Sequence, residues 1–547
     1  MKKYKLHQLL IQHHSDLLDH TINLKERHSS NKTINLLGSG YSSNKTINLK
    51  EGHRSNKTIN LKEGHSSNKT INLKEGHSSN KTINLKEGHS SNKTINLKEG
   101  HSSDSLSDEN SSDESLKSSS KTCESLGFPE IPSIINTDRT LTKRLIAIGD
   151  IHGDLDLALN CLTIARVIKR VFLYKDKNNV EIKDEESDIL SDIDDEDDEY
   201  PSKRLENAKH FRPFDLPHDI VTLKYKDEIK PRYYKWIGEN TVVIQVGDQV
   251  DRCRPVDNEC DHPKETVNDE ASDVKILFLF HDLHLVALKS PGCAVYSLLG
   301  NHELLNVLGN LRYVSYMGLQ EFNKKDSPSS SDQTDLFEGR KKAFDIKSNL
   351  KLYKEKSNLS NFLACARVSS IIVDKYLFVH AGILEKLINY TNKFSNKKVE
   401  TINTINNSIK KWLLNTDLKK ENKYITQLLS GKTLSPFWPR IFGNLPTGLD
   451  ASNELCTNHV NPVLKKLGLK GLVVGHTPQL KIDINSTCSD TVWRVDVGSS
   501  QAFEKVFDRD ITDQSEEDKH KIKEGRKPQV LEITLNDDGK DTFNVLK

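Results

Sequence analysis

Several short apolar runs in this chain end in side chains that can hold a metal ion. The first spans residues 144–154 and ends in Gly149-Asp150-Ile151-His152-Gly153-Asp154. An apolar run closed by Gly-Asp is typical of a buried strand that ends at a functional loop. Five later runs end in the same way, at Gly247-Asp248, Gly300-Asn301-His302-Glu303, His380-Ala381-Gly382, Gly475-His476 and Asp496-Val497-Gly498.

The elements that position these residues are predicted to be strands of one α/β core. In open α/β sheets, ligands bind just beyond the carboxyl ends of the strands, so six such strands would direct these side chains at one crevice. Asp and Asn oxygens combined with imidazoles suit borderline divalent metals such as Mn, Fe and Zn. Two such ions, roughly 3.5–4 Å apart, form a clamp for in-line displacement at phosphorus and lower the pKa of a bridging water. The pattern therefore predicts a site that hydrolyses phosphoesters.

The ordered motifs Gly-Asp-x-His-Gly, Gly-Asp-x-x-Asp-Arg, Gly-Asn-His-Glu, His-Ala-Gly and Gly-His resemble those of the calcineurin-like metallophosphoesterases, and within them the phosphoprotein phosphatases. The later segments are most similar to the Shewanella-like (bacterial-type) protein phosphatases, in Ser435-Pro436-Phe437-Trp438-Pro439-Arg440, Asp496-Val497-Gly498, Ala502-Phe503 and the closing run 528–533. The resemblance covers about residues 140–547. It implies an α/β fold, a calcineurin-like β-sandwich flanked by helices in α-β-β-α order.

The same resemblance implies a centre of two divalent metal ions, Mn, Fe or Zn. Its ligands are assigned by position in the motifs: Asp150, His152, Asp248, Asn301, His380 and His476. Asp248 would bridge the ions, with Asp150 and His152 on the first ion alone. Many relatives place a further histidine two residues after Gly-His, whereas this chain has Pro478, so the first ion would keep three protein ligands.

Catalytic roles are implied in the same way. His302 would protonate the leaving alkoxide or phenoxide, a contribution on the order of 10²–10⁴-fold for a general acid. Asp251 would orient His302 and keep it cationic, because a neighbouring carboxylate raises the pKa of an imidazole. Arg252 and Arg440, with Asn301, would bind the substrate phosphate, since guanidinium groups suit phosphoryl oxygens.

Two further acids and one cysteine lie in the motifs. Glu303 and Asp154 would orient the metal ligands, whereas Asp496 would either do the same or cap a turn. The family usually has glycine after Asp-Arg, but this chain has Cys253. A side chain there would crowd the Arg252 loop, and a free thiol beside the site would make activity sensitive to oxidation.

Composition indicates an ordinary soluble enzyme. The 547 residues are 35% hydrophobic and 29% charged, and the net charge of +1 indicates neither a nucleic-acid nor a membrane partner. Eight cysteines occur singly, without a Cys-x-x-Cys pair, so the sequence predicts neither a zinc knuckle nor a disulfide framework. It has no run of eighteen apolar residues and no apolar signal-peptide core. With unpaired cysteines favouring a reducing compartment, we expect an intracellular, cytoplasmic protein.

The chain divides into four parts. We expect a short N-terminal segment at 1–20, twelve-residue tandem repeats at 21–101, a serine-rich acidic linker at 102–139 and the catalytic domain at 140–547. The catalytic domain would carry insertions near 174–235 and 324–360.

The repeat settles to Asn-Lys-Thr-Ile-Asn-Leu-Lys-Glu-Gly-His-Ser-Ser, with copies at Asn44, Asn56, Asn68, Asn80 and Asn92. Each copy has one Ile and one Leu, too few to bury a stacked core, which predicts a disordered tail. A small solenoid is the alternative for such a regular repeat.

The sequence thus predicts a metal-dependent phosphomonoester hydrolase. We expect a protein phosphatase that removes phosphate from Ser/Thr or Tyr of a protein or peptide, by attack of a metal-bridging hydroxide. The enzymatic alternative is a dinucleoside-polyphosphate or other nucleotide hydrolase, which shares these motifs. The non-enzymatic alternative is a pseudophosphatase scaffold. Oligomeric state and preferred residue stay open.

Overall fold

The computed structural model describes seven strands within residues 19–98, and then residues 122–175, 180–184, 218–223, 232–322, 333–354, 357–394, 401–416, 422–430, 433–511 and 514–547. The predicted segment 1–20, the linker 102–139 and the insertion near 174–235 lie mostly outside these residues. The predicted domain boundaries therefore stay predictions.

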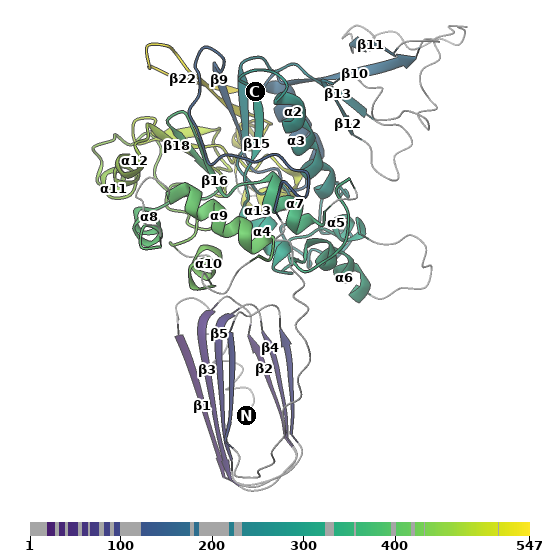
Figure 1. Ribbon diagram of the computed structural model, residues 1–547, viewed down its shortest axis with the longest axis vertical. Coiled ribbons are helices and arrows are strands. Elements are labelled where there is room, and N and C mark those ends of the chain that lie inside the picture. The colour runs from purple at the N-terminus through teal and green to yellow at the C-terminus, as the bar shows by residue number, and fades with distance from the viewer. Residues whose placement is uncertain are drawn as a thin grey trace, which may run out of the picture. The chain divides into compact units, whose positions relative to one another are not determined.

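Two sheets form the centre of the catalytic domain (Figure 1). The first has the order β15 (Ala294–Ser297), β14 (Thr241–Gln245), β9 (Arg144–Ile148), β21 (Val530–Thr534) and β22 (Thr542–Leu546). The second has the order β19 (Asn485–Thr487), β20 (Val492–Arg494), β18 (Gly471–Val474), β17 (Tyr376–Val379), β16 (Ser370–Val373) and β8 (Ile134–Ile135).

Strand β9 shows how the two sheets are packed. Its side chains alternate between the two faces of the sheet, as in any strand. Leu145 and Ala147 belong to the core cluster between the sheets, which also contains Phe378 of β17. Ile146 and Ile148 belong to the cluster on the opposite face, under α2 and α3. The near-continuous apolar run of β9 is therefore explained by burial on both faces.

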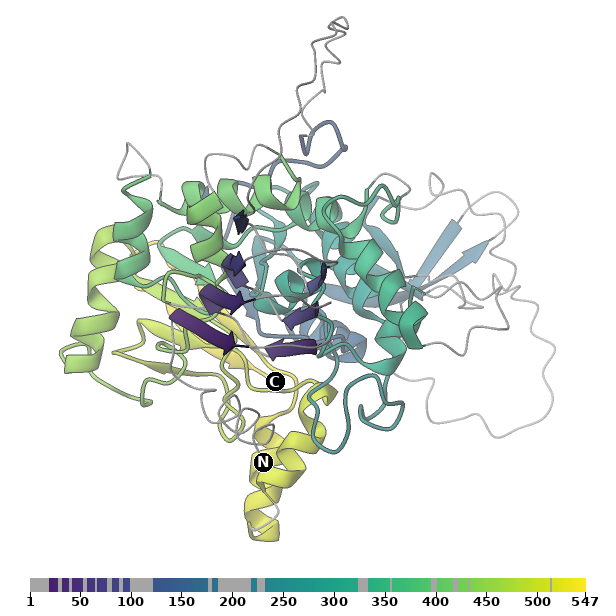
Figure 2. The ribbon, with the colours of Figure 1, turned by 90° about the horizontal axis from the view of Figure 1, so that it is seen from below.

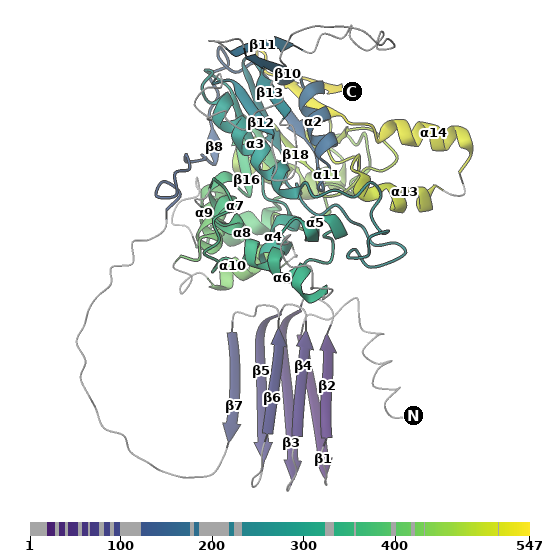
Figure 3. The same ribbon diagram turned by 90° about the vertical axis from the view of Figure 1, so that its right-hand side faces the viewer.

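Helices cover the outer faces. The first sheet is covered by α2 (Leu155–Ile164) and α3 (Asp273–Ala287), whereas α9 (Thr401–Leu413) packs on β16 and on α7 (Leu359–Ala366). The other helices are α4 (Asn301–Val307), α5 (Tyr316–Gln320), α6 (Gln333–Phe344), α8 (Glu385–Thr391), α10 (Asn422–Leu429), α11 (Glu454–His459), α12 (Asn461–Leu467), α13 (Glu504–Asp510) and α14 (Glu516–Gly525). Figures 2 and 3 show α14 standing out from the domain. The predicted helix-flanked β-sandwich is confirmed.

The predicted insertion near 174–235 forms part of a separate four-stranded sheet. Its order is β11 (Val180–Asp184), β10 (Ile168–Lys175), β13 (Arg232–Trp236) and β12 (Ile220–Leu223), and all neighbours are antiparallel. Figure 1 shows this sheet extending from one side of the sandwich. The insertion therefore leaves the central sheets intact.

The repeats are described as β1 (Asp19–Arg27), β2 (Lys32–Gly38), β3 (Ser42–Gly52), β4 (Lys57–Glu63), β5 (Ser66–Glu75), β6 (Lys81–Glu87) and β7 (Asn92–Lys98). Alternate strands pair in parallel, in the orders β1-β3-β5-β7 and β2-β4-β6. The register sets identical residues of alternate repeats side by side, such as Ile47, Ile71 and Ile95. Parallel pairing of alternate repeats would give a solenoid with two repeats per turn, and the prediction of a disordered tail stays a prediction.

Three disulfides correct the prediction that the cysteines form no disulfide framework. They join Cys123 to Cys365, Cys253 to Cys260 and Cys456 to Cys488, whereas Cys161 and Cys293 are free and buried. The partners are 242, 7 and 32 residues apart, so the spacing of cysteines along the chain could not reveal them. The argument for a reducing compartment loses its basis. Among the described residues, no helix is both long and apolar enough to span a membrane.

Candidate active site

The predicted site residues lie where strands of both sheets end. Strands β9, β14 and β15 are parallel neighbours, as are β17, β18 and β20. Their carboxyl ends therefore meet at one edge of each sheet. The loops that follow carry Asp150, His152, Asp248, Asn301, His380 and His476, all of them buried.

These loops hold non-glycine residues in the left-handed backbone region. The φ angles of His152, Asp248, Asp251 and His476 are 47°, 52°, 74° and 66°. Such conformations are uncommon outside glycine and cost free energy that the surrounding structure must supply. Three predicted ligands and Asp251 therefore have strained backbone.

Two glycines of the motifs leave room for carboxylates. A Cβ at Gly300 would overlap Oδ1 of Asp248, and one at Gly475 would overlap Oδ1 of Asp150. Each motif glycine is therefore required by a carboxylate that a different strand supplies.

One group of possible ligand atoms surrounds His380. Its Nδ1 lies 3.0 Å from the Val246 carbonyl, so Nδ1–H donates there and Nε2 points at the site. Nε2 lies 2.9 Å from Oδ1 of Asn301 and 3.2 Å from Oδ2 of Asp248. His476 donates from Nε2 to the Trp438 carbonyl at 3.1 Å, which leaves its Nδ1 as a ligand atom. Burial lowers the pKa of His380, but the Asp248 carboxylate outweighs it and raises that pKa, so this position favours a positive charge, as a bound cation would supply.

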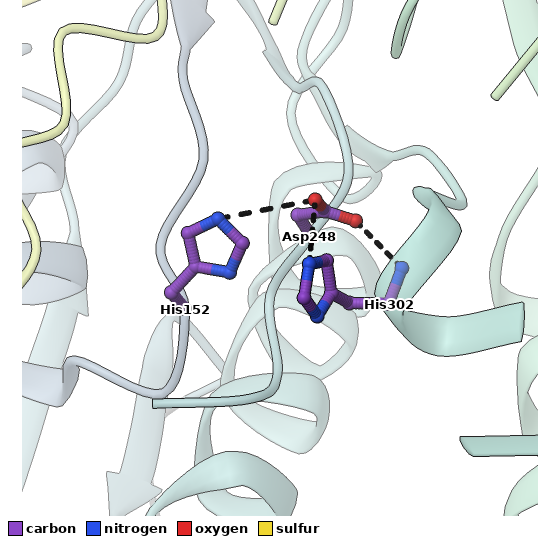
Figure 4. Close-up of side chains that lie close together, drawn as sticks. All are labelled: His152, Asp248 and His302. Carbon is purple, nitrogen blue, oxygen red and sulfur yellow. Dashed lines mark hydrogen bonds and ion pairs between the residues drawn. The ribbon is translucent and has the colours of Figure 1, made fainter. Parts of the chain in front are cut away.

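A second group contains His152, Asp248 and His302 (Figure 4). Oδ2 of Asp248 lies 3.9 Å from Nε2 of His152 and 3.8 Å from Nε2 of His302. Asp150 completes this side, with Oδ2 3.9 Å from Nε2 of His152. Asp248 therefore belongs to both groups, as a bridging ligand should.

The electrostatics of this cluster also fit bound cations. Burial, and then the carboxylates of Asp496 and Asp248, raise the pKa of Asp150 well above its usual range. Burial raises the pKa of Asp496 to about 6. Its Oδ2 is buried and has no hydrogen-bond partner among the described residues. Buried acids in such proximity are expected to be paired with metal ions. The residues present therefore fit a metal centre.

His302 and Asp251 form a hydrogen-bonded pair beside this centre. Nδ1 of His302 lies 2.7 Å from Oδ2 of Asp251, and both side chains are buried. The backbone N–H of His302 donates to Oδ1 of Asp248 at 2.9 Å, which fixes the imidazole relative to the bridging carboxylate. The predicted pair is thus brought together, with Nε2 of His302 facing the possible ligand atoms.

Comparison with known proteins decides the family. Residues 143–480, more than half of the chain, match the family model described as calcineurin-like phosphoesterase. The chain belongs to the calcineurin-like phosphoesterases. The predicted family and the assignment as a hydrolase of the phosphatase type are confirmed, and members of this family use a dinuclear divalent metal centre.

Individual proteins and a solved structure also align with this chain. The chain is 37% identical over 270 residues to the uncharacterized protein R398 of Acanthamoeba polyphaga mimivirus. This alignment covers 47% of this chain and 95% of that protein. It is 25% identical over 289 residues to Shewanella-like protein phosphatase 2 of Arabidopsis thaliana, covering 49% of this chain and 64% of that protein. A solved cold-active protein tyrosine phosphatase aligns with a TM-score of 0.41 and 15% identity, covering 77% of this chain and 82% of that one.

The side chains of two arginines, Arg252 and Arg440, lie differently from what the sequence predicted. Arg252 does not reach the ligand groups. Its Nη1 donates to the Gly153 carbonyl and to Oε1 of Glu270, both at 2.9 Å, and its Nη2 donates to the Asn268 carbonyl at 3.0 Å. The Arg252 side chain is therefore occupied by protein acceptors. Arg440 is exposed, and its Nη1 donates to the carbonyl of the ligand His476 at 2.9 Å, which leaves it at the rim of the site.

Arg254 lies in the site instead, and sequence reasoning missed it. Its Nη2 is 2.8 Å from Nε2 of His152 and 3.3 Å from Nε2 of His302. The guanidinium stacks on the rings of Phe503 and Tyr313, 4.7 and 5.3 Å from their centroids. Its position two residues after Arg252, in Arg-Cys-Arg, was the available signal.

The disulfide between Cys253 and Cys260 corrects the prediction of a free thiol beside the site. It closes the segment that begins with Arg254. Glu265 binds the same segment, because its carboxylate accepts the backbone N–H groups of Val256 and Asn258 at 2.5 and 2.9 Å. The cysteine that replaces the family's glycine therefore anchors a loop.

Of the two acids expected to orient ligands, Glu303 contacts a predicted ligand, whereas Asp154 contacts other groups. Glu303 accepts the backbone N–H groups of Asp248 and Gly300 at 3.1 and 2.6 Å, which fixes two of the motif loops. Asp154 caps α2 by accepting from the N–H of Leu157 and also accepts from that of Gln501.

Proposed function

We propose that this phosphoesterase is a protein phosphatase that hydrolyses phosphoserine, phosphothreonine or phosphotyrosine. The observation that carries the proposal is the buried pair of His302 and Asp251, 3.8 Å from the shared carboxylate of Asp248. Serine and threonine alkoxides are poor leaving groups, so their departure gains most from a positioned general acid. The similarity to the Arabidopsis protein named Shewanella-like protein phosphatase 2 supports the same substrate class.

Six side chains would hold the metal centre: Asp150, His152, Asp248, Asn301, His380 and His476. When bound, two ions of Mn, Fe or Zn would polarise the phosphoryl group and supply a hydroxide nucleophile at neutral pH. The donor set of oxygens and imidazoles contains no thiolate, which favours these metals over thiophilic ones.

The residues of the chain would do the remaining work. His302 would donate the proton on Nε2 to the leaving oxygen while Asp251 holds Nδ1. Arg254, whose Nη2 lies beside His152 and His302, would donate to a substrate phosphate. Arg440 would contact the same phosphate from the rim, and Asn301 from the metal side. Arg252 would have a structural role.

The test is phosphate release from phosphoserine, phosphothreonine and phosphotyrosine peptides in the presence of Mn²⁺. Wild type should release phosphate, and His302→Asn should be slower on the order of 10²-fold or more. His459→Asn, a change at the end of α11 outside the ligand groups, is the matched control and should leave the rate unchanged.

The alternatives give different results in the same assay. A nucleotide hydrolase would release mononucleotides from diadenosine tetraphosphate and leave the phosphopeptides intact. A scaffold would hydrolyse neither substrate and would contain no metal after purification, as mass spectrometry would show.

A further inference from the structure

Arg340 of α6 is a completely buried arginine in the predicted insertion near 324–360, outside the family motifs. Each part of its guanidinium has a partner. Nε donates to Oδ1 of Asn306 at 2.7 Å, Nη1 to the Gly318 carbonyl at 3.0 Å and Nη2 to Oδ2 of Asp273 at 2.5 Å. A planar guanidinium held in this way has one orientation, and it fixes the groups that it contacts.

These contacts lead to the carboxylate that holds His302. Oδ2 of Asp251 bonds His302, which leaves Oδ1 for other donors. Oδ1 accepts from Nδ2 of Asn306 at 2.7 Å and lies 3.5 Å from Nη2 of Arg340. The backbone N–H of Asp251 donates to Oδ2 of Asp273 at 3.2 Å. Arg340 therefore contacts Asp251 directly, through Asn306 and through Asp273.

We propose that Arg340 is a positioning residue for the general acid, holding the Asp251 carboxylate in the orientation that aims His302 at the leaving group. The inference rests on the proposed function, since it concerns the same proton transfer. It adds that a helix outside the family motifs sets the geometry of the catalytic pair.

The charges make Arg340 necessary for this orientation. Asp251 and Asp273 are both buried, with 0% and 3% of their surfaces exposed. Without Arg340 they would face each other with no cation between them, and water could not screen their repulsion. Asp251 also has a φ of 74°, so its backbone conformation depends on the surrounding contacts. Rotation of its carboxylate would move His302 with it.

A displaced general acid has a kinetic signature that a loss of stability lacks. A leaving group of high basicity, such as phenolate or the serine alkoxide, needs the proton in the transition state. The weakly basic 2,4-dinitrophenolate departs without it. A misplacement of about 1 Å can cost on the order of 10²-fold in rate. The loss in an Arg340 variant should therefore depend on the leaving group.

The experiment compares kcat and KM on a phosphoserine peptide, phenyl phosphate and 2,4-dinitrophenyl phosphate for wild type and variants of the full chain loaded with Mn²⁺. In Arg340→Met, kcat should fall on the order of 10²-fold on the first two substrates and less than about 3-fold on the third. KM and the metal content should not change. Arg340→Lys should recover part of the loss, and Asn306→Ala should show a smaller loss of the same kind.

Arg139→Met is the matched control. Arg139 also pairs with two carboxylates, Asp374 and Asp541, at 2.8 and 2.7 Å, but it contacts none of the ligand groups. This variant should be less stable than wild type and show no dependence on the leaving group.

Equal losses on all three substrates in the Arg340 variants would overturn the inference. If Arg340→Met does not fold, Arg340→Lys and Asn306→Ala decide in the same way. Wild-type activity on both aryl phosphates but on no phosphopeptide would overturn the proposed substrate class instead, and the two aryl phosphates would then decide the inference.

Discussion

Replacing Arg254 and Arg252 separately by methionine tests which arginine serves the substrate. The two side chains are two residues apart but have different surroundings. The guanidinium of Arg254 lies against His152 and His302 and bonds no carboxylate of the described residues, whereas that of Arg252 donates to Glu270. Methionine keeps most of the apolar stem and removes the charge in both cases.

The expected magnitudes follow from these contacts. A hydrogen bond from a charged donor is worth about 1.5–3 kcal/mol, so loss of Arg254 from the substrate phosphate should lower kcat/KM about 10- to 150-fold. Arg252 has 4% of its surface exposed and donates to the Gly153 and Asn268 carbonyls and to Glu270. The Gly153 carbonyl would still accept from Ser272, and Glu270 from the N–H of Leu155. A hydrogen bond from a charged donor is worth about 1.5–3 kcal/mol, so this variant should lose about that much stability.

The assays are kcat/KM on a phosphopeptide and the urea midpoint of unfolding. We expect Arg254→Met to lose activity at an unchanged midpoint, and Arg252→Met to unfold at lower urea. Rim residue Arg440, as Arg440→Met, should lose less activity than Arg254→Met because it is exposed. The reasoning is refuted if Arg252→Met loses activity at a wild-type midpoint while Arg254→Met stays active, as the family motif alone predicts.

Three further outcomes are expected. Asp248→Asn should retain fewer than two ions per chain after dialysis, by mass spectrometry, because Asp248 belongs to both ligand groups; two retained ions would contradict this. Dithiothreitol should lower kcat/KM of wild type but not of Cys260→Ser, because that variant lacks the Cys253–Cys260 disulfide. Equal responses of the two proteins would show that this disulfide does not hold the Arg254 loop. Burial lowers the pKa of His284 to about 4, below roughly 6.5 in the unfolded chain. Folding therefore favours neutral His284, whose contribution is complete above pH 6.5 and falls by up to about 3 kcal/mol towards pH 4. His284→Gln should lose less unfolding free energy than wild type between about pH 6.5 and pH 4. If urea unfolding shows the same pH dependence of stability in both proteins, His284 is not the group responsible.

The positions of the candidate ligands in the fold could be predicted from the sequence, because each candidate follows a strand closely in the chain. Asp150, Asp248 and His476 directly follow short strands, and the loop geometry is set by glycines that neighbouring carboxylates require. A strand end with its loop is encoded within about ten residues. A motif scan therefore finds the ligand, and parallel pairing of the strands brings the ligands together.

The partners of long side chains could not be predicted in this way. Whether Arg252 or Arg254 enters the site depends on Glu270 and Phe503, residues of distant segments. Arg340 lies in a largely polar helix, Gln333–Phe344, on the same face as Phe337 and Phe344, but the sequence of the helix cannot name acceptors in other segments. Its burial follows from the acceptors that three other segments bring to it.

Disulfide pairing and the pairing of the repeats both depend on contacts between separate segments of the chain. Cys123 and Cys365 are 242 residues apart, and only the folded chain brings them together. One Ile and one Leu per repeat are too little apolar surface to bury a core within a single repeat. Pairing between repeats depends instead on the register of one copy against another. In that register, Thr46 lies opposite Thr70 of another copy. The composition of one copy cannot predict such a pairing.

The active site lies at the junction of the two sheets, and this explains why the family needs both. The first sheet supplies Asp150 and Asp248, whereas the second supplies His380 and His476. Contacts cross the junction in both directions, because the N–H of His476 donates to Asp150 and Nε2 of His380 lies beside Asp248. Ions held there would join the two halves of the sandwich, so the strength of metal binding depends on how the sheets pack. The core residues between the sheets are therefore as much a part of the centre's geometry as the loops that carry its ligands.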